Sequence, residues 1–135
     1  MRATMLLLAM LLVCAGPAGS ADDIAAAQSV IRAQERAFSR DDAAGAYSYA
    51  APAIRELFPQ PSIFMFMVQH SYAPVFRHNS FEFGEAKAAG GMIAQRVHIV
   101  DENGEWWEAL YTLERQADGT LKITGCTLLK VGAAA

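Results

Sequence analysis

The sequence predicts a single α+β domain in which N-terminal helices pack on a curved, four-stranded antiparallel sheet. The first observation is a change in composition near residue 80, where Ala, Gln, Met and spaced aromatic residues give way to alternating β-branched and polar residues. The second is that Asn103-Gly104 and Asp118-Gly119, dipeptides typical of tight hairpins, divide the later part into strands. Helices followed by strands are typical of a fold with helices on one face of an antiparallel sheet.

A long first helix is predicted over residues 22–40, where apolar residues recur at helical spacing behind two aspartates that favour a helix N-terminus. The stripe consists of Ile24, Ala27, Ile31, Glu35 and Phe38. Shorter helical segments follow, each beginning at a residue suited to a helix start, namely Asp41 or Asp42, Pro52 and Ser62. Pro74 is expected to end the last helix, because proline disfavours helical conformation in the residue before it.

Four strands are expected, over residues 81–84, 94–100, 105–116 and 121–131. Gly90-Gly91 separates the first strand from the second, and the two hairpin dipeptides separate the others. Residues 132–135 are expected to form a frayed tail. The domain itself is therefore predicted to span residues 22–131.

Size and composition exclude several classes of protein. The chain has 135 residues, enough for one domain only. A hydrophobic fraction of 53% excludes intrinsic disorder, and two cysteines are too few for a disulfide scaffold. A net charge of −3 argues against a nucleic-acid binder, which would carry a basic face.

The first 21 residues are predicted to be a secretory signal peptide. Arg2 precedes an apolar run over residues 5–13, and Gly19-Ser20-Ala21 supplies the small residues of a cleavage site. The run is too short for a stable membrane anchor, which needs about 20 apolar residues. Acylation at Cys14 is an alternative, although Val13 is larger than a lipoprotein signal prefers. Cleavage after Ala21 would make the protein periplasmic or secreted.

Cleavage would leave Cys126 without a second cysteine for an internal disulfide. Three interpretations stay open: a small buried side chain within a strand, an intermolecular bridge, or a reactive thiol.

The pairing register determines which strand residues face the helices. A two-residue turn at Asn103-Gly104 would place Val100 opposite Trp107. Arg96, His98, Trp107 and Tyr111 would then share one face. A three-residue loop over residues 117–119 is favoured in the last hairpin, because it places Glu114 opposite Lys122. That loop would add residues of the last strand to the helix-facing side, namely Ile123, Gly125, Thr127, Leu129 and Val131.

This register makes Arg96, His98, Trp107 and Tyr111 the candidate ligand-binding residues. The structural alternatives are that Arg96 pairs with a carboxylate such as Glu56 or reaches solvent at the rim, and that the two aromatic side chains belong to the core or to a dimer interface. A slip of one residue would replace the set by Gln95, Glu108 and Thr112. The opposite face is too apolar to be fully solvated and suggests a homodimer; it comprises Ile93, Val97, Ile99, Trp106 and Leu110.

Several strand motifs are shared with a known family. They are Gln95-x-Val97, Trp107-x-x-x-Tyr111-x-Leu113-x-Arg115-Gln116-x-Asp118-Gly119 and Ile123-x-Gly125-Cys126. Through them, the chain resembles a bacterial secreted group, domain-of-unknown-function family 4864, over nearly all of the predicted mature chain. More broadly, the order of elements resembles the nuclear-transport-factor-two-like (SnoaL-like) superfamily. That resemblance implies a cone-shaped domain and dimerisation through the convex side of the sheet, but it says nothing specific about activity.

The expected function is non-catalytic: binding of a small, largely apolar ligand in the cone, or service as an interaction module. The alternative is an isomerase or lyase that uses His98 with Tyr111, or Glu108, for proton transfer. No cofactor is expected. No metal site is expected either, because His70, His78 and His98 lack zinc-ligand spacing and Met67 with His70 is an incomplete ligand set.

Overall fold

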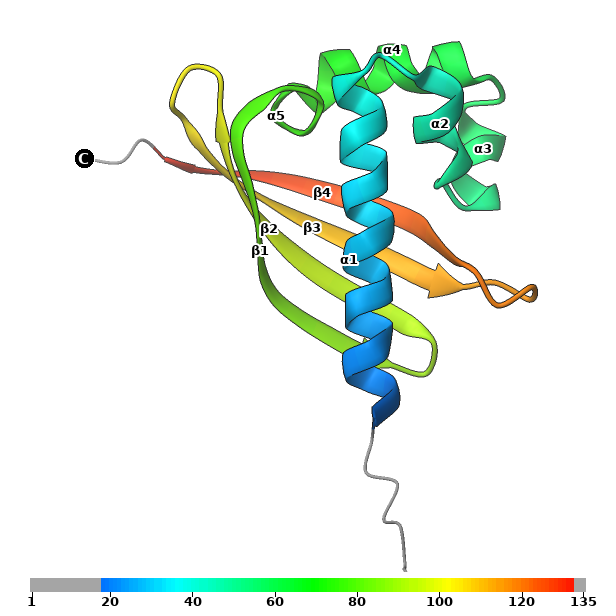
Figure 1. Ribbon diagram of the computed structural model, residues 1–135. Helices are drawn as coiled ribbons and strands as arrows, with labels where there is room; N and C mark the ends of the chain where they lie inside the picture. Colours follow the sequence, from blue (N-terminus) through cyan, green and yellow to red (C-terminus); the bar gives the residue numbers. More distant parts are fainter. Residues whose placement is uncertain (1–17, 133–135) are drawn as a thin grey trace, which may run out of the picture.

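The computed structural model describes residues 18–132, in which five helices precede four strands (Figure 1). The helices are α1 (Ala18–Ser39), α2 (Ala43–Ser48), α3 (Pro52–Leu57), α4 (Pro61–Ser71) and α5 (Ala73–Phe76). The strands are β1 (His78–Ala89), β2 (Met92–Asp101), β3 (Trp106–Arg115) and β4 (Leu121–Gly132). The predicted α+β class is confirmed.

The strands form one antiparallel sheet in the order β1-β2-β3-β4, and this sheet is open, with β1 and β4 at its edges. Figure 1 shows α1 crossing one face of the sheet, with α2, α3 and α4 gathered at the C-terminal end of α1. We call the face that the helices cover the inner face, and the opposite face the outer face.

Local sequence explains where the short helices begin. Asp42 caps α2 as predicted, and its carboxylate accepts a hydrogen bond of 2.9 Å from the backbone N–H of Gly45. Pro52 opens α3, also as predicted. Pro61 rather than Ser62 opens α4, and Pro74 lies inside the short helix α5 rather than after the last helix. Both differences have one cause: proline has no N–H to lose in the first turn, and its fixed φ suits a helix start.

The β2–β3 hairpin differs from the prediction by one residue. Val100 lies opposite Trp106, not Trp107, and Asp101 pairs with Glu105 through a backbone hydrogen bond of 2.9 Å. The loop therefore contains three residues rather than two, which turns β2 over relative to β3. Gln95, Val97 and Ile99 of β2 are buried on the inner face, with Tyr111 and Leu113 of β3.

The β3–β4 hairpin has the predicted three-residue loop, and Glu114 lies opposite Lys122. A bulge then interrupts β4, because Leu113 pairs with Ile123 while Thr112 pairs with Gly125. The extra residue reverses the faces of the rest of the strand. The prediction for this part of β4 is therefore wrong: Cys126 and Leu128 pack against the core, whereas Thr127, Leu129 and Val131 are exposed.

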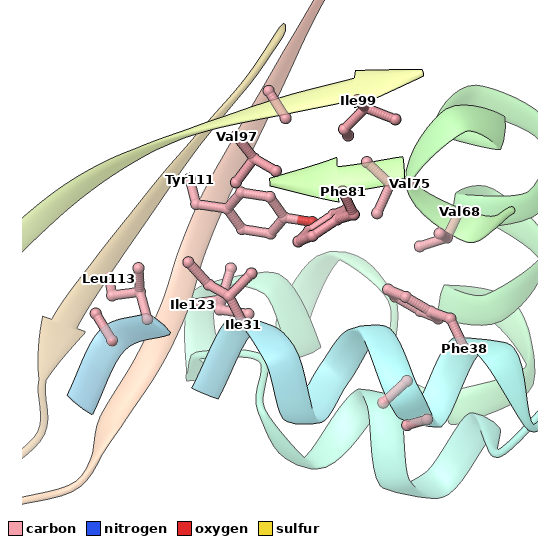
Figure 2. Close-up of a cluster of buried hydrophobic side chains, with 14 of the residues drawn as sticks. Ile31, Phe38, Val68, Val75, Phe81, Val97, Ile99, Tyr111, Leu113 and Ile123 are labelled. Carbon is pink, nitrogen blue, oxygen red and sulfur yellow. The ribbon is translucent and has the colours of Figure 1, made fainter. Parts of the chain in front are cut away.

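The core lies between α1 and the inner face. Figure 2 shows Ile31 and Phe38 of α1 pointing toward the strands, with Phe81, Val97 and Tyr111 opposite them. The apolar stripe predicted for the first helix is buried at Ala27, Ile31 and Phe38. Burial of each large side chain stabilises the fold by about 1.5–3 kcal/mol, so this layer holds α1 on the sheet.

The predicted signal-peptide run, the acylation candidate Cys14 and the last three residues of the predicted tail lie outside the described residues. Gly132, which was assigned to the tail, ends β4. Across residues 18–132, no helix is long and apolar enough to span a membrane.

Candidate functional site

A cavity of about 340 Å³ lies between the helices and the β4 side of the inner face, and we call it the inner cavity. Its aromatic lining consists of Phe38, Phe58, Phe64, Tyr72 and Tyr111, and its aliphatic lining of Ile54, Leu57, Met67, Val68, Val75 and Ile123. Leu57 lines this cavity and is also 75% exposed, so the cavity reaches the surface beside α3. Pro52 starts α3, and Pro61 starts α4, so two proline-initiated helices build the wall around the opening.

The inner cavity has no charged lining residue among the residues that the structure describes. Most of its polar groups are already used within the fold. The hydroxyl of Tyr72 donates to the carbonyl of Cys126 at 2.9 Å, and the amide of Gln34 donates to the carbonyl of Ala46 at 3.1 Å. Thr124 donates to the hydroxyl of Thr112 at 2.9 Å. The wall therefore offers mainly apolar contact to an occupant.

Tyr111 and Cys126 form the polar pair at the sheet side of the cavity. They lie opposite each other on β3 and β4, and both line the cavity. Burial raises the pKa of the Cys126 thiol to about 12, although the hydrogen bond from Tyr111 lowers it. Burial raises the pKa of Tyr111 as well, and the nearby Cys126 and Glu35 add to this rise. Both groups are thus uncharged at neutral pH.

A second polar group lies beside α1 at the edge of the core, and we call its partly buried residues Arg32, Glu35 and His78 the Glu35 cluster. The Glu35 carboxylate is 2.6 Å from Nη1 of Arg32 and 2.6 Å from Nε2 of His78. Nδ1 of His78 lies 2.9 Å from the carbonyl oxygen of Pro74. Both ring nitrogens of His78 therefore lie within hydrogen-bond distance of an oxygen, one of Pro74 and one of Glu35.

The charge of Glu35 is stabilised by this cluster. Burial alone would raise the pKa of the carboxyl, but hydrogen bonds from His78 and Arg32 outweigh it, so the pKa lies below its usual value. Arg32 also lies over the ring of Phe83, with its guanidinium carbon 4.7 Å from the ring centroid. The cluster joins α1 to β1 and closes the core next to Phe81, which packs 4.9 Å from the His78 ring.

The family comparison agrees with the sequence resemblance. The model of DUF4864, a domain of unknown function, matches residues 20–135. The chain belongs to this family. No curated protein and no solved structure matches it. The inner cavity and the Glu35 cluster are features of this DUF4864 domain.

The DUF4864 structure separates the four predicted site residues. Tyr111 lies on the inner face and lines the inner cavity. Trp107 also lies on the inner face, but its indole N–H donates to Asp101 at 2.9 Å, and it lines a different, more polar depression of about 520 Å³ near α5. Arg96 and His98 lie on the outer face, because the extra residue of the β2–β3 loop turns β2 over.

Arg96 and His98 make their contacts on the outer face and do not line the inner cavity. Arg96 forms an ion pair of 2.8 Å with Glu108. The predicted carboxylate partner is therefore present, but it is Glu108 and not Glu56. His98 packs over Gly84, where an added Cβ would lie 2.5 Å from Nε2. The alternative set is divided too, since Gln95 is buried on the inner face and Thr112 lies on the outer face with Glu108.

The sequence did contain a signal for the Glu35 cluster. Glu35 stands in the otherwise apolar stripe of the first helix, and a carboxylate on a buried face needs a partner. The partner itself, His78, is distant in sequence and has no motif that would identify it. In residues 18–132, no group of three or more His, Cys, Asp or Glu side chains is arranged to hold a metal ion.

Proposed function

We propose that this DUF4864 domain binds a small, uncharged, largely apolar molecule in the inner cavity and performs no chemistry on it. The observation that carries the proposal is a cavity of about 340 Å³ whose described lining residues are mainly aromatic and aliphatic and bear no charge. That volume is within the range of sites for small molecules. A charged ligand group would be left unpaired there, at a substantial desolvation cost.

The enzyme alternative has less support. The acid–base residues expected for it, His98 and Glu108, lie on the outer face, away from the inner cavity. Tyr111 and Cys126 line the cavity, but burial raises the pKa of each, which disfavours a base or a nucleophile at neutral pH. Binding without turnover is therefore the function we favour.

The proposal is tested with N-phenyl-1-naphthylamine, an uncharged dye whose fluorescence rises in apolar surroundings. We expect saturable binding. Its anionic relative, 1-anilinonaphthalene-8-sulfonate, should bind more weakly because its sulfonate finds no partner in the cavity wall. Ile54→Trp, which adds a large ring at the cavity wall, should weaken dye binding by about tenfold or more.

The matched control is Ile63→Trp, because Ile63 is 43% exposed on α4 and does not line the inner cavity. It should leave dye binding unchanged. An absence of saturable binding to the wild-type domain, or equal losses in the two variants, would contradict ligand capture in this cavity.

We also propose that the domain belongs to the nuclear-transport-factor-two-like superfamily. Helices followed by an open four-stranded antiparallel sheet, with a cavity between the two layers, support this placement. Export to the periplasm or beyond is part of the same proposal and is supported by the pattern of residues 1–21. N-terminal sequencing of the protein recovered from a periplasmic extract should then begin at Asp22.

A homodimer through the outer face is the remaining part of the proposal. Trp106, Leu129 and Val131 on this face are 49%, 63% and 56% exposed, amid charges of both signs. Such a face suits a two-fold contact between copies. The prediction of which residues form this face is partly wrong, since Ile93, Val97 and Ile99 are buried in the core. Light scattering should give twice the monomer mass, and Trp106→Gln should reduce it.

A further inference from the structure

One continuous part of the chain supplies much of the inner cavity and carries no charged side chain of the Asp, Glu, Lys or Arg type. This stretch, residues 57–76, covers the end of α3, all of α4 and all of α5. Its flanks are charged, with Glu56 before it and Arg77 after it. The buried face of α4 explains only part of this composition, because a helix at a protein surface normally has charged residues on its other side.

The exposed side of the stretch instead presents three large apolar side chains among the polar residues Gln60, Ser62, Gln69, His70 and Ser71. Leu57, Ile63 and Phe66 are 75%, 43% and 62% exposed, and we call them the α3–α4 patch. Ile63 and Phe66 are three residues apart on α4, so they lie on the same side of the helix. Phe64, Met65 and Val68 form the buried side. Figure 1 shows α4 lying across the end of the molecule at the C-terminus of α1.

The α3–α4 patch adjoins the opening of the inner cavity. Leu57 belongs to both, since it lines the cavity and is largely exposed. On α4, Phe66 of the patch is followed directly by Met67, which lines the cavity. Leu57 thus links the outside of the helices to the cavity with an apolar side chain, in a stretch that has no Asp, Glu, Lys or Arg residue.

The outer face of the sheet provides a contrast. Leu129 is as exposed as Phe66, at 63%, but it lies opposite Glu108, which is paired with Arg96. A mixture of apolar and charged groups suits another protein surface. Acyl chains offer no partner for a charge, so an uncharged apolar patch suits a bilayer.

We propose that the α3–α4 patch docks this domain on a lipid surface, with Leu57, Ile63 and Phe66 inserted among the acyl chains. Because the stretch has no basic residue, docking depends on apolar insertion and not on anionic headgroups. If the inner cavity binds an apolar molecule, as proposed above, its opening faces the phase in which such a molecule dissolves. The docking itself does not depend on that function.

The test is flotation of the protein with vesicles. We expect wild-type protein to float with vesicles of phosphatidylcholine alone, and to a similar degree when phosphatidylglycerol is included. Phe66→Gln should lower the partition coefficient by about tenfold or more, because it removes one large inserted side chain. Leu57→Gln should act in the same direction. Leu129→Gln, which alters an equally exposed side chain on the outer face, should leave flotation unchanged.

All variants share the same N-terminus, so any contribution of residues 1–21 cancels in the comparison. Flotation that is absent in the wild type, that is unaffected by Phe66→Gln, or that requires phosphatidylglycerol would overturn the proposal. A Phe66→Gln variant that instead loses self-association in light scattering, with no change in flotation, would assign the patch to contact between copies. Dye binding in solution tests the cavity separately, and Phe66→Gln should leave it unchanged because Phe66 does not line the cavity.

Discussion

Glu35 of α1 and His78 of β1 lie 43 positions apart in the chain, and their carboxylate and imidazole approach to 2.6 Å. Each side chain is only 14% exposed, and Nη1 of Arg32 also lies 2.6 Å from the same carboxylate. The pair connects the first helix to the first strand through a partly buried polar contact. The contribution of this pair to the free energy of unfolding can be measured by replacing His78.

Replacing His78 should expose the cost of leaving Glu35 with one partner fewer. We expect His78→Gln to lower the free energy of unfolding by about 2 kcal/mol, because removing one hydrogen-bond partner of a partly buried carboxylate leaves its charge poorly compensated. Urea unfolding followed by circular dichroism measures the change. The control is His98→Gln on the outer face, which should alter stability by less than about 0.5 kcal/mol. Equal effects of the two substitutions would contradict a special role for the pair.

Acid should weaken the fold through Glu35. The pKa of this carboxyl is lowered in the folded state, because hydrogen bonds from His78 and Arg32 outweigh burial. The unfolded chain therefore binds the proton more readily, so the stabilisation is present above the ordinary pKa of 4.5 and is lost as the pH falls through the folded pKa. Below pH 4.5, wild type should lose stability more steeply than Glu35→Gln in unfolding titrations. Parallel curves for the two proteins would refute this origin.

Cys126 should be chemically inert while the domain is folded. Burial raises the pKa of its thiol to about 12, so only about one molecule in ten thousand carries the thiolate at pH 8. Labelling with 5,5′-dithiobis(2-nitrobenzoic acid) should be very slow in buffer and complete within minutes in strong urea. Of the three interpretations left open by the sequence, this favours the small buried side chain. Rapid labelling of the folded protein would instead indicate an accessible, reactive thiol.

Asp101 should contribute strongly to stability through the β2–β3 loop. Its carboxylate accepts hydrogen bonds from the backbone N–H groups of Asn103 and Glu105 and from the indole of Trp107, each at 2.9 Å. Asp101→Ala should lower the free energy of unfolding by about 2 kcal/mol, because it leaves these donors without their acceptor. Asp101→Asn should cost less, since its amide oxygen can still accept. Glu102→Ala, an exposed neighbour, is the control, and a cost equal to that of Asp101→Ala would argue against this network.

The elements governed by local chemistry were predictable from the sequence. The stripe of the first helix, the Asp42 cap and the loop of the last hairpin depend on residues close together in the chain, and all three were predicted. The β2–β3 register was not, because Asp101 gathers donors from three residues and holds a longer loop than the Asn103-Gly104 dipeptide suggests. Of the predicted site, Tyr111 reached the inner cavity, while Arg96 and His98 followed β2 to the outer face.

Because of the bulge at Thr124, the side of the sheet that later β4 side chains face depends on the number of residues in the strand as well as on their identity. Residues 125–130 of β4 take their side of the sheet from the presence of this one inserted position, before a second irregularity opposite Trp106 and Trp107. Deletion of that position would reverse the faces of the residues that follow. Cys126 and Leu128 would turn outward, and Thr127 and Leu129 would turn toward the helices. A relative with the same residues but one fewer between Ile123 and Cys126 would therefore have a different cavity floor. When members of this family are compared, a gap in this strand should count for more than a substitution.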